Sequence, residues 1–312
     1  MPERLVVSLP DDRLSAHLAA LADPVPEGAV EWVRWAVDGP APAERIDIAV
    51  LPYLSMDSGR LGFLSTASVG LVQSQSIGYD GVADALPSGL VYANASSVHE
   101  TATAELALAL LLASQRGIDD FVRNAEAGRW SPHRHPSLAD RTVLILGYGG
   151  VGKAVEARLA GFEVARVIRV ASRAREDAAG HVHGIDELRA LLPQADVVVI
   201  GTPLTDATRG LVGAKELAAL PDGALVVNVA RGPVLDTAAV LAEAGRLRFA
   251  LDVTDPEPLP ADHPLWAAPG VVISPHVGGA ASSMEPRMAR LLRRQIGHLL
   301  AGENCENVVL RS

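Results

Sequence analysis

The chain has 312 residues, 49% of them hydrophobic and 21% charged, which is enough apolar material for about two buried domain cores. Its formal net charge of −10 disfavours nucleic acid or an anionic membrane as the main partner, because both attract basic surfaces. The single cysteine, Cys305, excludes an internal disulfide, and the apolar stretches are too short to span a bilayer, so we expect a cytoplasmic protein.

Residues 1–97 alternate short apolar runs with helical patterns, which favours a parallel sheet with helices on its faces. Tyr53 and Leu54 follow one of the expected strands and are candidate substrate contacts, although a packing role would explain them equally well. The runs with strand character are RLVVSLP (4–10), EWVRWAV (31–37), IDIAVLP (46–52), VGLVQSQSIG (69–78) and LVYANA (90–95).

A long helix is expected from residues 97–100 to about Arg116, because N-cap candidates open it and a basic residue closes it. It is apolar on most of its surface, which fits a buried helix, a helix that bridges two domains or a helix at a subunit interface. Two short histidine motifs, HRH (133–135) and HVH (181–183), lack partner ligands in a convincing pattern. We therefore expect both in loops or on the surface and predict no metal site.

A second alternating series follows, and its six expected strands match the number in a complete dinucleotide-binding unit. The last segment reads as a helix with apolar residues on one side. We predict an α/β chain in which a substrate domain, 1–97 and 283–312, encloses a dinucleotide-binding domain, 98–282. The six strands are expected at 142–146, 164–170, 196–201, 224–229, 248–252 and 271–274.

The segment GYGGVG (147–152) has the spacing G-x-G-x-x-G between an expected strand and an expected helix. Gly147 permits a tight turn, Gly149 lets backbone approach a pyrophosphate, and Gly152 allows close packing of helix on strand. The helix N-terminus offers free N–H groups to the anion. We assign cofactor contacts to the whole turn, including Tyr148, Gly150 and Val151.

The second strand of this series lacks the acidic residue that usually holds the adenosine ribose and ends in ASRAR instead. Ser172 can donate to a phosphate, and Arg173 and Arg175 can pair with it through their forked donors. Two solvated surface arginines are the alternative reading. Their position after the strand end favours NADP over NAD.

Three later stretches place a polar side chain just after an apolar strand, where open α/β sheets bind ligands: VVNVARGPVLD, ALDVTDPEPLP and VVISPHVGG. Arg231, Glu257 and His276 are their chemically capable members. Singly, each could be structural, as an ion pair, a turn acid and a satisfied histidine. Their occurrence at three successive strand ends favours a joint catalytic role.

These stretches, with GTPLTDATRGLV, VQSQSIGYD and AELALALLL, resemble the D-isomer-specific 2-hydroxyacid dehydrogenase family over nearly the whole chain. The related formate dehydrogenases carry Gln where this chain has Glu257, which argues against formate as the substrate. The resemblance implies a Rossmann-type cofactor domain inserted in a flavodoxin-like substrate domain, and a homodimer with the long helix and the following excursion at the interface.

The resemblance also implies a mechanism, in which His276 protonates the carbonyl oxygen of a 2-oxo acid as hydride reaches the carbon. Glu257 would orient the imidazole, and Arg231 would bind the carboxylate and polarise the carbonyl. The backbone near Ser76, Ile77 and Gly78 resembles a second carboxylate clamp. The remaining cofactor contacts are assigned to Thr202 and Pro203 at the adenine, Asp252 at the carboxamide, and Val229, Ala230 and Gly278.

We therefore predict an NADPH-dependent reductase for a small 2-oxo acid, with glyoxylate or hydroxypyruvate as the first candidates. One alternative is a D-2-hydroxyacid dehydrogenase for bulkier substrates that uses NAD(H). Another is a nucleotide-sensing protein of the corepressor type, which shares the fold and even the triad. Rapid NADPH oxidation with any 2-oxo acid would separate an enzyme from a sensor.

Overall fold

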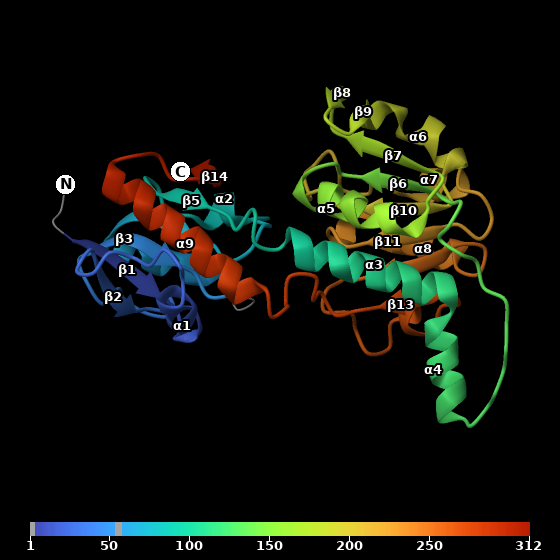
Figure 1. Ribbon diagram of the computed structural model, residues 1–312, viewed down its shortest axis with the longest axis horizontal. Helices are drawn as coiled ribbons and strands as arrows, with labels where there is room; N and C mark the ends of the chain where they lie inside the picture. Colours follow the sequence, from blue (N-terminus) through green and yellow to red (C-terminus); the bar gives the residue numbers. More distant parts are fainter. Residues whose placement is uncertain (1–3, 54–57) are drawn as a thin grey trace. The chain divides into compact units, whose positions relative to one another are not determined.

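The computed structural model describes residues 4–53 and 58–312, and the chain divides into two compact units (Figure 1). Unit 1 comprises residues 1–99 and 280–312, and unit 2 comprises residues 100–279. The domain limits expected from the sequence, after residues 97 and 282, lie within three residues of these limits, at 99 and 279. The described residues include no helix that is both long and apolar enough to cross a membrane.

Within its described residues, unit 1 forms a six-stranded sheet in the order β14-β5-β4-β3-β1-β2. Strands β1 to β5 are parallel, and their order 2-1-3-4-5 is the flavodoxin-like order that the sequence predicts. The elements are β1 (Leu5–Leu9), α1 (Arg13–Ala19), β2 (Val30–Arg34), β3 (Arg45–Val50), the 3-10 helix η1 (Ser58–Thr66), β4 (Ser68–Gln73), α2 (Val82–Ala85), β5 (Val91–Ala93), α9 (Met284–Ala301) and β14 (Val308–Arg311).

Helices cover both faces of this sheet, and the strand side chains divide between two apolar clusters. In β3, Ile48 and Val50 pack with residues of α1 and α9 on one face, whereas Ile46 and Ala49 pack with η1 and α2 on the other. The C-terminal α9 therefore returns to the domain in which the chain begins, as its position in Figure 1 shows.

Unit 2 contains an eight-stranded sheet in the order β13-β12-β11-β10-β6-β7-β9-β8, counted over residues 100–279, all of which are described. All neighbours are parallel except β8, which runs antiparallel to β9 at the edge. The strands are β6 (Thr142–Leu146), β7 (Arg166–Ala171), β8 (Arg175–Asp177), β9 (Gly180–Gly184), β10 (Val197–Ile200), β11 (Leu225–Asn228), β12 (Arg248–Leu251) and β13 (Val271–Ile273).

The strands of this second sheet are buried on both faces, so they read as nearly continuous Val, Ile and Leu. Val143 and Ile145 face the cluster formed with α3 and α5, whereas Leu144 and Leu146 face the cluster formed with α6, α7 and α8. The α-helices are α3 (Glu100–Arg116), α4 (Ile118–Glu126), α5 (Gly150–Leu159), α6 (Leu188–Leu191), α7 (Ala214–Ala218) and α8 (Thr237–Glu243). Short 3-10 helices complete the unit: η2 (Ala160–Phe162), η3 (Ile185–Glu187), η4 (Leu192–Gln194), η5 (Gly232–Val234) and η6 (Pro264–Ala267).

The strand order confirms the predicted Rossmann-type domain, and all six strands expected in it are present. Three observed strands, β8, β9 and the C-terminal β14, were not expected from the sequence. The HVH motif was expected in a loop or on the surface, and it lies in β9, which is the third strand of the first half of the sheet. Its central residue, Val182, is fully buried, and this burial explains why the segment is a strand.

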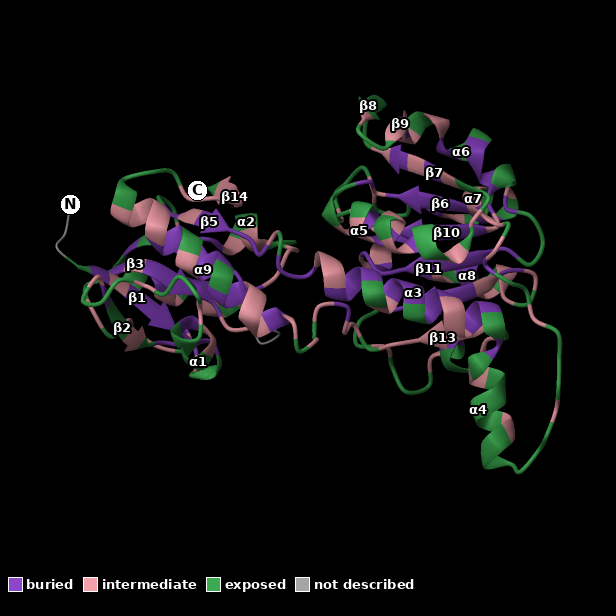
Figure 2. Ribbon diagram, in the orientation of Figure 1, coloured by how far each residue is buried: buried purple, intermediate pink, exposed green. Residues whose placement is uncertain are grey.

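The long helix of the sequence analysis is α3, and a second helix, α4, follows it after Gly117. Gly117 has a left-handed conformation with a φ of 62°, which lets the chain change direction between the two helices. Residues 118–126 are all described and none of them is buried, so α4 is mostly exposed, with a few half-buried residues (Figure 2). The helix packs against α3, and its Phe121 ring contacts His135.

Candidate active site

The glycine turn is packed so closely that side chains are excluded at two of its positions. Gly147 has a φ of 104°, and a Cβ there would lie 2.6 Å from the backbone nitrogen of Thr202. A Cβ at Gly152 would lie 2.2 Å from the carbonyl oxygen of Gly147. These contacts bring the turn after β6 against the segment after β10, the neighbouring parallel strand.

The opposite side of the turn is open, which is the arrangement that a dinucleotide requires. A Cβ at Gly149 would meet nothing within 4 Å, and the ten-residue α5 begins directly after it at Gly150. The free N–H groups of this helix end can therefore meet an anion. The Tyr148 side chain is buried and donates to Glu156, so this residue can offer the cofactor only its backbone.

The segment after β7 places cations beside the turn. Ser172 and Arg173 are exposed, and the Arg175 guanidinium donates a 2.9 Å hydrogen bond to the carbonyl oxygen of Tyr148. Arg175 is thus anchored to the glycine turn itself.

The sequence analysis missed a further cation, Lys153, whose ammonium lies 2.8 Å from the Asp177 carboxylate. The hydrogen bond from Lys153 holds the pKa of Asp177 below its usual value. In the sequence, Lys153 could have been noticed as a basic residue in the first turn of the helix that follows the glycines. Lys153 is close to Arg175, whose guanidinium lies 3.9 Å from the same carboxylate.

The three catalytic candidates follow β11, β12 and β13, which are adjacent parallel strands. The carboxyl ends of these strands lie at one edge of the sheet, so the loops that carry Arg231, Glu257 and His276 emerge side by side. The structure brings Glu257 and His276 into direct contact, with 2.5 Å between Glu257 Oε1 and His276 Nδ1.

The contact between His276 and Glu257 fixes the direction of the imidazole. Each side chain is 40% exposed, so the pair is accessible to a small molecule. With Nδ1 bound to the carboxylate, the ring presents Nε2 for chemistry. The hydrogen bond from His276 lowers the pKa of Glu257, and the positive charge of Arg231 lowers it further.

Asp252, at the end of β12, organises the segment that carries the histidine. Its Oδ1 accepts hydrogen bonds from Ser274 Oγ at 2.7 Å and from the Val277 amide at 2.9 Å, and its Oδ2 accepts from the Gly278 amide at 2.8 Å. Its carbonyl oxygen also accepts from the His276 amide at 2.7 Å. The side chain is buried, and a carboxylate with about four acceptor positions retains one for a further donor.

The loop that carries Arg231 is fixed by two residues that the sequence analysis did not select. Asn228 is fully buried; its Oδ1 accepts from the Ala230 amide, and its amide group donates to the carbonyl oxygen of Arg231. A Cβ at Gly232 would lie 1.8 Å from the carbonyl oxygen of Thr254, so the loops after β11 and β12 touch through their backbones. A buried Asn at a strand end, followed by a glycine, was the available signal.

The matched family is the D-isomer specific 2-hydroxyacid dehydrogenase family, whose NAD-binding domain model covers residues 108–278. This match spans more than half of the chain and includes the turn, Arg231, Glu257 and His276. The chain belongs to this family.

Curated relatives and solved structures agree with this assignment. The glyoxylate reductase of Korarchaeum cryptofilum is 32% identical over 260 residues, 79% of this chain and 78% of that protein. The glyoxylate reductase of Aeropyrum pernix is 34% identical over 255 residues, 77% of this chain and 76% of that protein. A D-isomer specific 2-hydroxyacid dehydrogenase from Xanthobacter autotrophicus Py2, solved with NADPH and MES, is 29% identical, with a TM-score of 0.80 over 99% of this chain and 98% of that one.

This 2-hydroxyacid dehydrogenase is therefore an oxidoreductase that uses a nicotinamide dinucleotide. The resemblance stated from the sequence is confirmed. The residues of the glycine turn fit such a cofactor, since they combine an open backbone at Gly149 with a helix end. Three other predicted cofactor contacts are less accessible. Val229 and Ala230 are buried, and the Gly278 amide is already bound to Asp252.

The expected substrate loop of the dehydrogenase lies in unit 1, and the structure narrows it. The Ser76 amide donates to Ser74 Oγ at 3.0 Å, so it is already engaged. The Asn94 side chain donates to the carbonyl oxygen of Ile77 at 2.9 Å and holds the loop. Of the clamp expected at Ser76, Ile77 and Gly78, the Ser76 amide is thus engaged within the loop.

The other substrate candidates of unit 1 are Tyr53 and Leu54. The Tyr53 ring stacks on His99 with 5.4 Å between ring centroids, and His99 Nε2 lies 2.6 Å from the carbonyl oxygen of Gln75. Tyr53 is thus connected through His99 to the residue before Ser76. Leu54 lies outside the described residues.

Proposed function

We propose that this dehydrogenase reduces a small 2-oxo acid, of the glyoxylate or hydroxypyruvate class, to the D-2-hydroxy acid with NADPH. The observation that carries the proposal is the 2.5 Å contact between His276 Nδ1 and Glu257, under the positive charge of Arg231. The two relatives named glyoxylate reductase support the substrate class.

In the proposed mechanism, each of the three residues has one task. Arg231 binds the substrate carboxylate and polarises the neighbouring carbonyl through its paired N–H donors. His276 donates the Nε2 proton to the carbonyl oxygen, and Glu257 stabilises the ring as its charge changes. Bound NADPH supplies the hydride that the carbonyl carbon receives, so that hydride and proton together convert the carbonyl to a hydroxyl.

We propose that the amides of Ile77 and Gly78 donate to the substrate as well. The held conformation of their loop supports this role, because the Asn94 bond fixes the carbonyl between them. We also propose that Asp252 contacts the carboxamide through its remaining acceptor position. Its more extensive contribution is to position the segment that carries His276.

The preference for NADPH rests on the charges beside the glycine turn. A 2′-phosphate carries negative charge that an acid at Ala171 would repel, and this chain has none there. Arg173, Arg175 and Lys153 provide positive charge instead, and Arg175 is anchored to the turn. The NADPH complex of the Xanthobacter relative supports the same preference.

We further propose that two copies of the chain associate through α4 and the residues after it. Four large apolar side chains are exposed there: Ile118 by 47%, Phe121 by 38%, Val122 by 54% and Trp130 by 97%. A cluster of this kind typically marks a protein interface. A second copy would bury these side chains, which gives an otherwise exposed helix a partner.

The experiment that tests the catalytic assignment compares His276→Ala with the unaltered enzyme. Loss of a general acid lowers turnover by roughly 10²–10⁴-fold. Turnover of glyoxylate should fall by this amount while NADPH binding, followed by its fluorescence, stays near normal. His298→Ala is the matched control, since His298 forms a similar surface pair with Glu303, at 2.8 Å. Near-normal turnover in His276→Ala would overturn the assignment, and inactivity of the unaltered enzyme with every 2-oxo acid would favour a sensor.

A further inference from the structure

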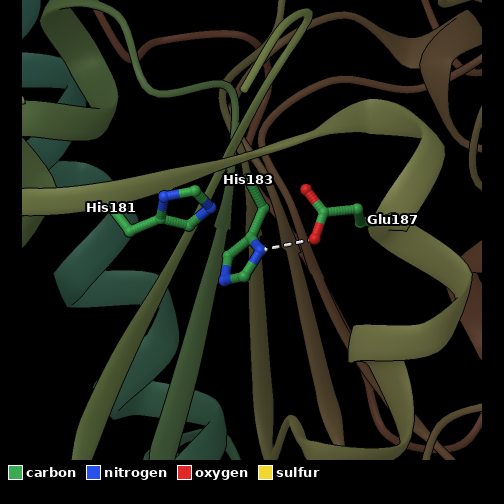
Figure 3. A group of neighbouring side chains, drawn as sticks. All are labelled: His181, His183 and Glu187. Atoms are coloured by element: carbon green, nitrogen blue, oxygen red, sulfur yellow. Dashed lines mark hydrogen bonds and ion pairs between the residues drawn. The ribbon is translucent and has the colours of Figure 1, made fainter. Parts of the chain in front are cut away.

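In the folded chain, Glu187 lies beside the two histidines of the HVH motif on β9. His181 and His183 are two residues apart on one strand, so both imidazoles stand on the same face. Glu187, four residues beyond His183, lies at the end of η3 and turns back toward them. One ligand atom from each of the three residues lies within 4.8 Å of the others, and Figure 3 shows the rings and the carboxylate facing one another.

The carboxylate of this cluster is already oriented. Glu187 Oε1 accepts from the Gly184 amide at 2.9 Å, and Glu187 Oε2 lies 2.8 Å from His183 Nδ1. A fixed, charged oxygen next to an imidazole nitrogen is suited to share a cation with it.

One ring nitrogen of His181 is bound to a carboxylate, as is common for histidines that bind a metal through the other nitrogen. Its Nδ1 lies 2.8 Å from the carboxylate of Glu176, which stands opposite it in the β8–β9 pair. A carboxylate on one ring nitrogen fixes the tautomer and makes the other nitrogen a better ligand. Nε2 of His181 is therefore the atom that this arrangement presents.

We propose that His181, His183 and Glu187 bind one divalent transition-metal ion. Zn²⁺ is the ion that best suits these ligands, and water completes its coordination. Two imidazoles and a carboxylate are a known zinc donor set, and imidazole ligands distinguish such ions from Mg²⁺ and Ca²⁺.

The separations of the ligand atoms are close to those that zinc needs. Bonds of 2.0–2.1 Å at tetrahedral angles put two ligand atoms about 3.3 Å apart. The His183–Glu187 contact of 2.8 Å opens by a few tenths of an ångström when the ion replaces the shared proton. The widest separation, at most 4.8 Å, closes by rotation of the His181 side chain, which is 49% exposed.

The position of the site gives the ion a structural task. β9 pairs with β7 at His183 and with β8 at His181. The ion would tie β9 to η3 and so fasten the edge of the sheet that carries Arg175. This inference does not depend on the proposed substrate, because it concerns the fold of unit 2 alone.

The test measures zinc binding to the whole enzyme without an affinity tag, after chelator treatment and dialysis. Calorimetry with zinc chloride at neutral pH should show one ion per chain, with a rise in Tm at excess zinc because the ion binds only the folded state. His183→Gln and Glu187→Gln should each weaken binding at least about tenfold, and Glu176→Gln by about tenfold through His181. Gln at position 187 retains the acceptor for the Gly184 amide, so the fold should be preserved.

His298→Gln is the matched control, because His298 and Glu303 form a 2.8 Å pair on the surface that belongs to no group of three possible ligands among the described residues. This variant should bind zinc like the unaltered enzyme. Circular dichroism confirms that each variant is folded. The inference is overturned if no stoichiometric zinc binding occurs, or if His183→Gln and Glu187→Gln bind as tightly as His298→Gln.

Discussion

The most informative single change outside the catalytic residues is Asp252→Asn. The carboxylate accepts three hydrogen bonds, two on Oδ1 and one on Oδ2. An amide keeps only one accepting atom, so at best it retains the bonds from Ser274 and Val277. Its NH₂ group then faces the Gly278 amide at 2.8 Å, donor against donor.

The expected loss of stability follows from this geometry. An unsatisfied buried donor costs about 1–3 kcal/mol, and the value is greater where a charged acceptor is lost, so we expect about 2–3 kcal/mol. For a domain of this size, that corresponds to a fall in Tm of roughly 4–10 °C. Since the same carboxylate positions the His276 segment, kcat should fall roughly 10- to 100-fold.

The assay combines a thermal melt with steady-state kinetics under saturating NADPH. Asp255→Asn serves as the control, because Asp255 is an exposed carboxylate three residues further along the same segment. The control should change Tm and kcat little. If Asp252→Asn melts within 1 °C of the unaltered enzyme and turns over equally well, the three bonds do not organise the site and the reasoning fails.

Three further predictions concern other parts of the protein. Glu257→Gln should lower kcat roughly 5- to 30-fold, the equivalent of about 1–2 kcal/mol for a charge-assisted hydrogen bond discounted for exposure, and an unchanged kcat would contradict its role. Because the pKa of Glu257 is lowered on folding, its stabilisation is present above the ordinary value of 4.5 and is lost as the pH falls through the folded-state pKa. The Tm difference between this variant and the parent should therefore narrow in acid. The double variant Arg173→Ala/Arg175→Ala should raise the KM for NADPH about tenfold or more and leave the KM for NADH nearly unchanged; equal shifts for both cofactors would refute 2′-phosphate recognition. Trp130→Ser should weaken self-association in sedimentation experiments, and a parent that is monomeric at all concentrations would refute the interface.

The fold class could be predicted from the sequence because buried parallel strands are nearly continuous apolar runs. The strands at 142–146 and 197–200 are of this kind, and the predicted α/β class is confirmed. The run Arg175–Asp177 consists of three charged residues, and Gly180–Gly184 contains one apolar side chain, Val182, so these two short strands lacked this signal. All six expected strands are present, and the sheet contains two more, β8 and β9.

The candidate site could be predicted where chemistry and chain position coincide, as they do for Arg231, Glu257 and His276. Residues that act by holding a loop could not be found in this way. The role of Asn228 is evident only from its hydrogen bonds to Ala230 and Arg231. These bonds depend on the three-dimensional path of the loop. Glu187 is a similar case, since it meets the HVH motif only after the chain turns at η3.

The backbone contact at Gly232 has a consequence for attempts to change the substrate range by directed evolution. With only 1.8 Å between a would-be Cβ and the carbonyl oxygen of Thr254, no other residue fits without moving the loop after β12. A library that varies Gly232 would consist almost entirely of inactive or unfolded clones. Randomisation is better spent on Ile77 and Gly78, which are only half-buried, because a new side chain there would change the fit of the proposed substrate and leave the loops that carry Arg231 and Glu257 intact.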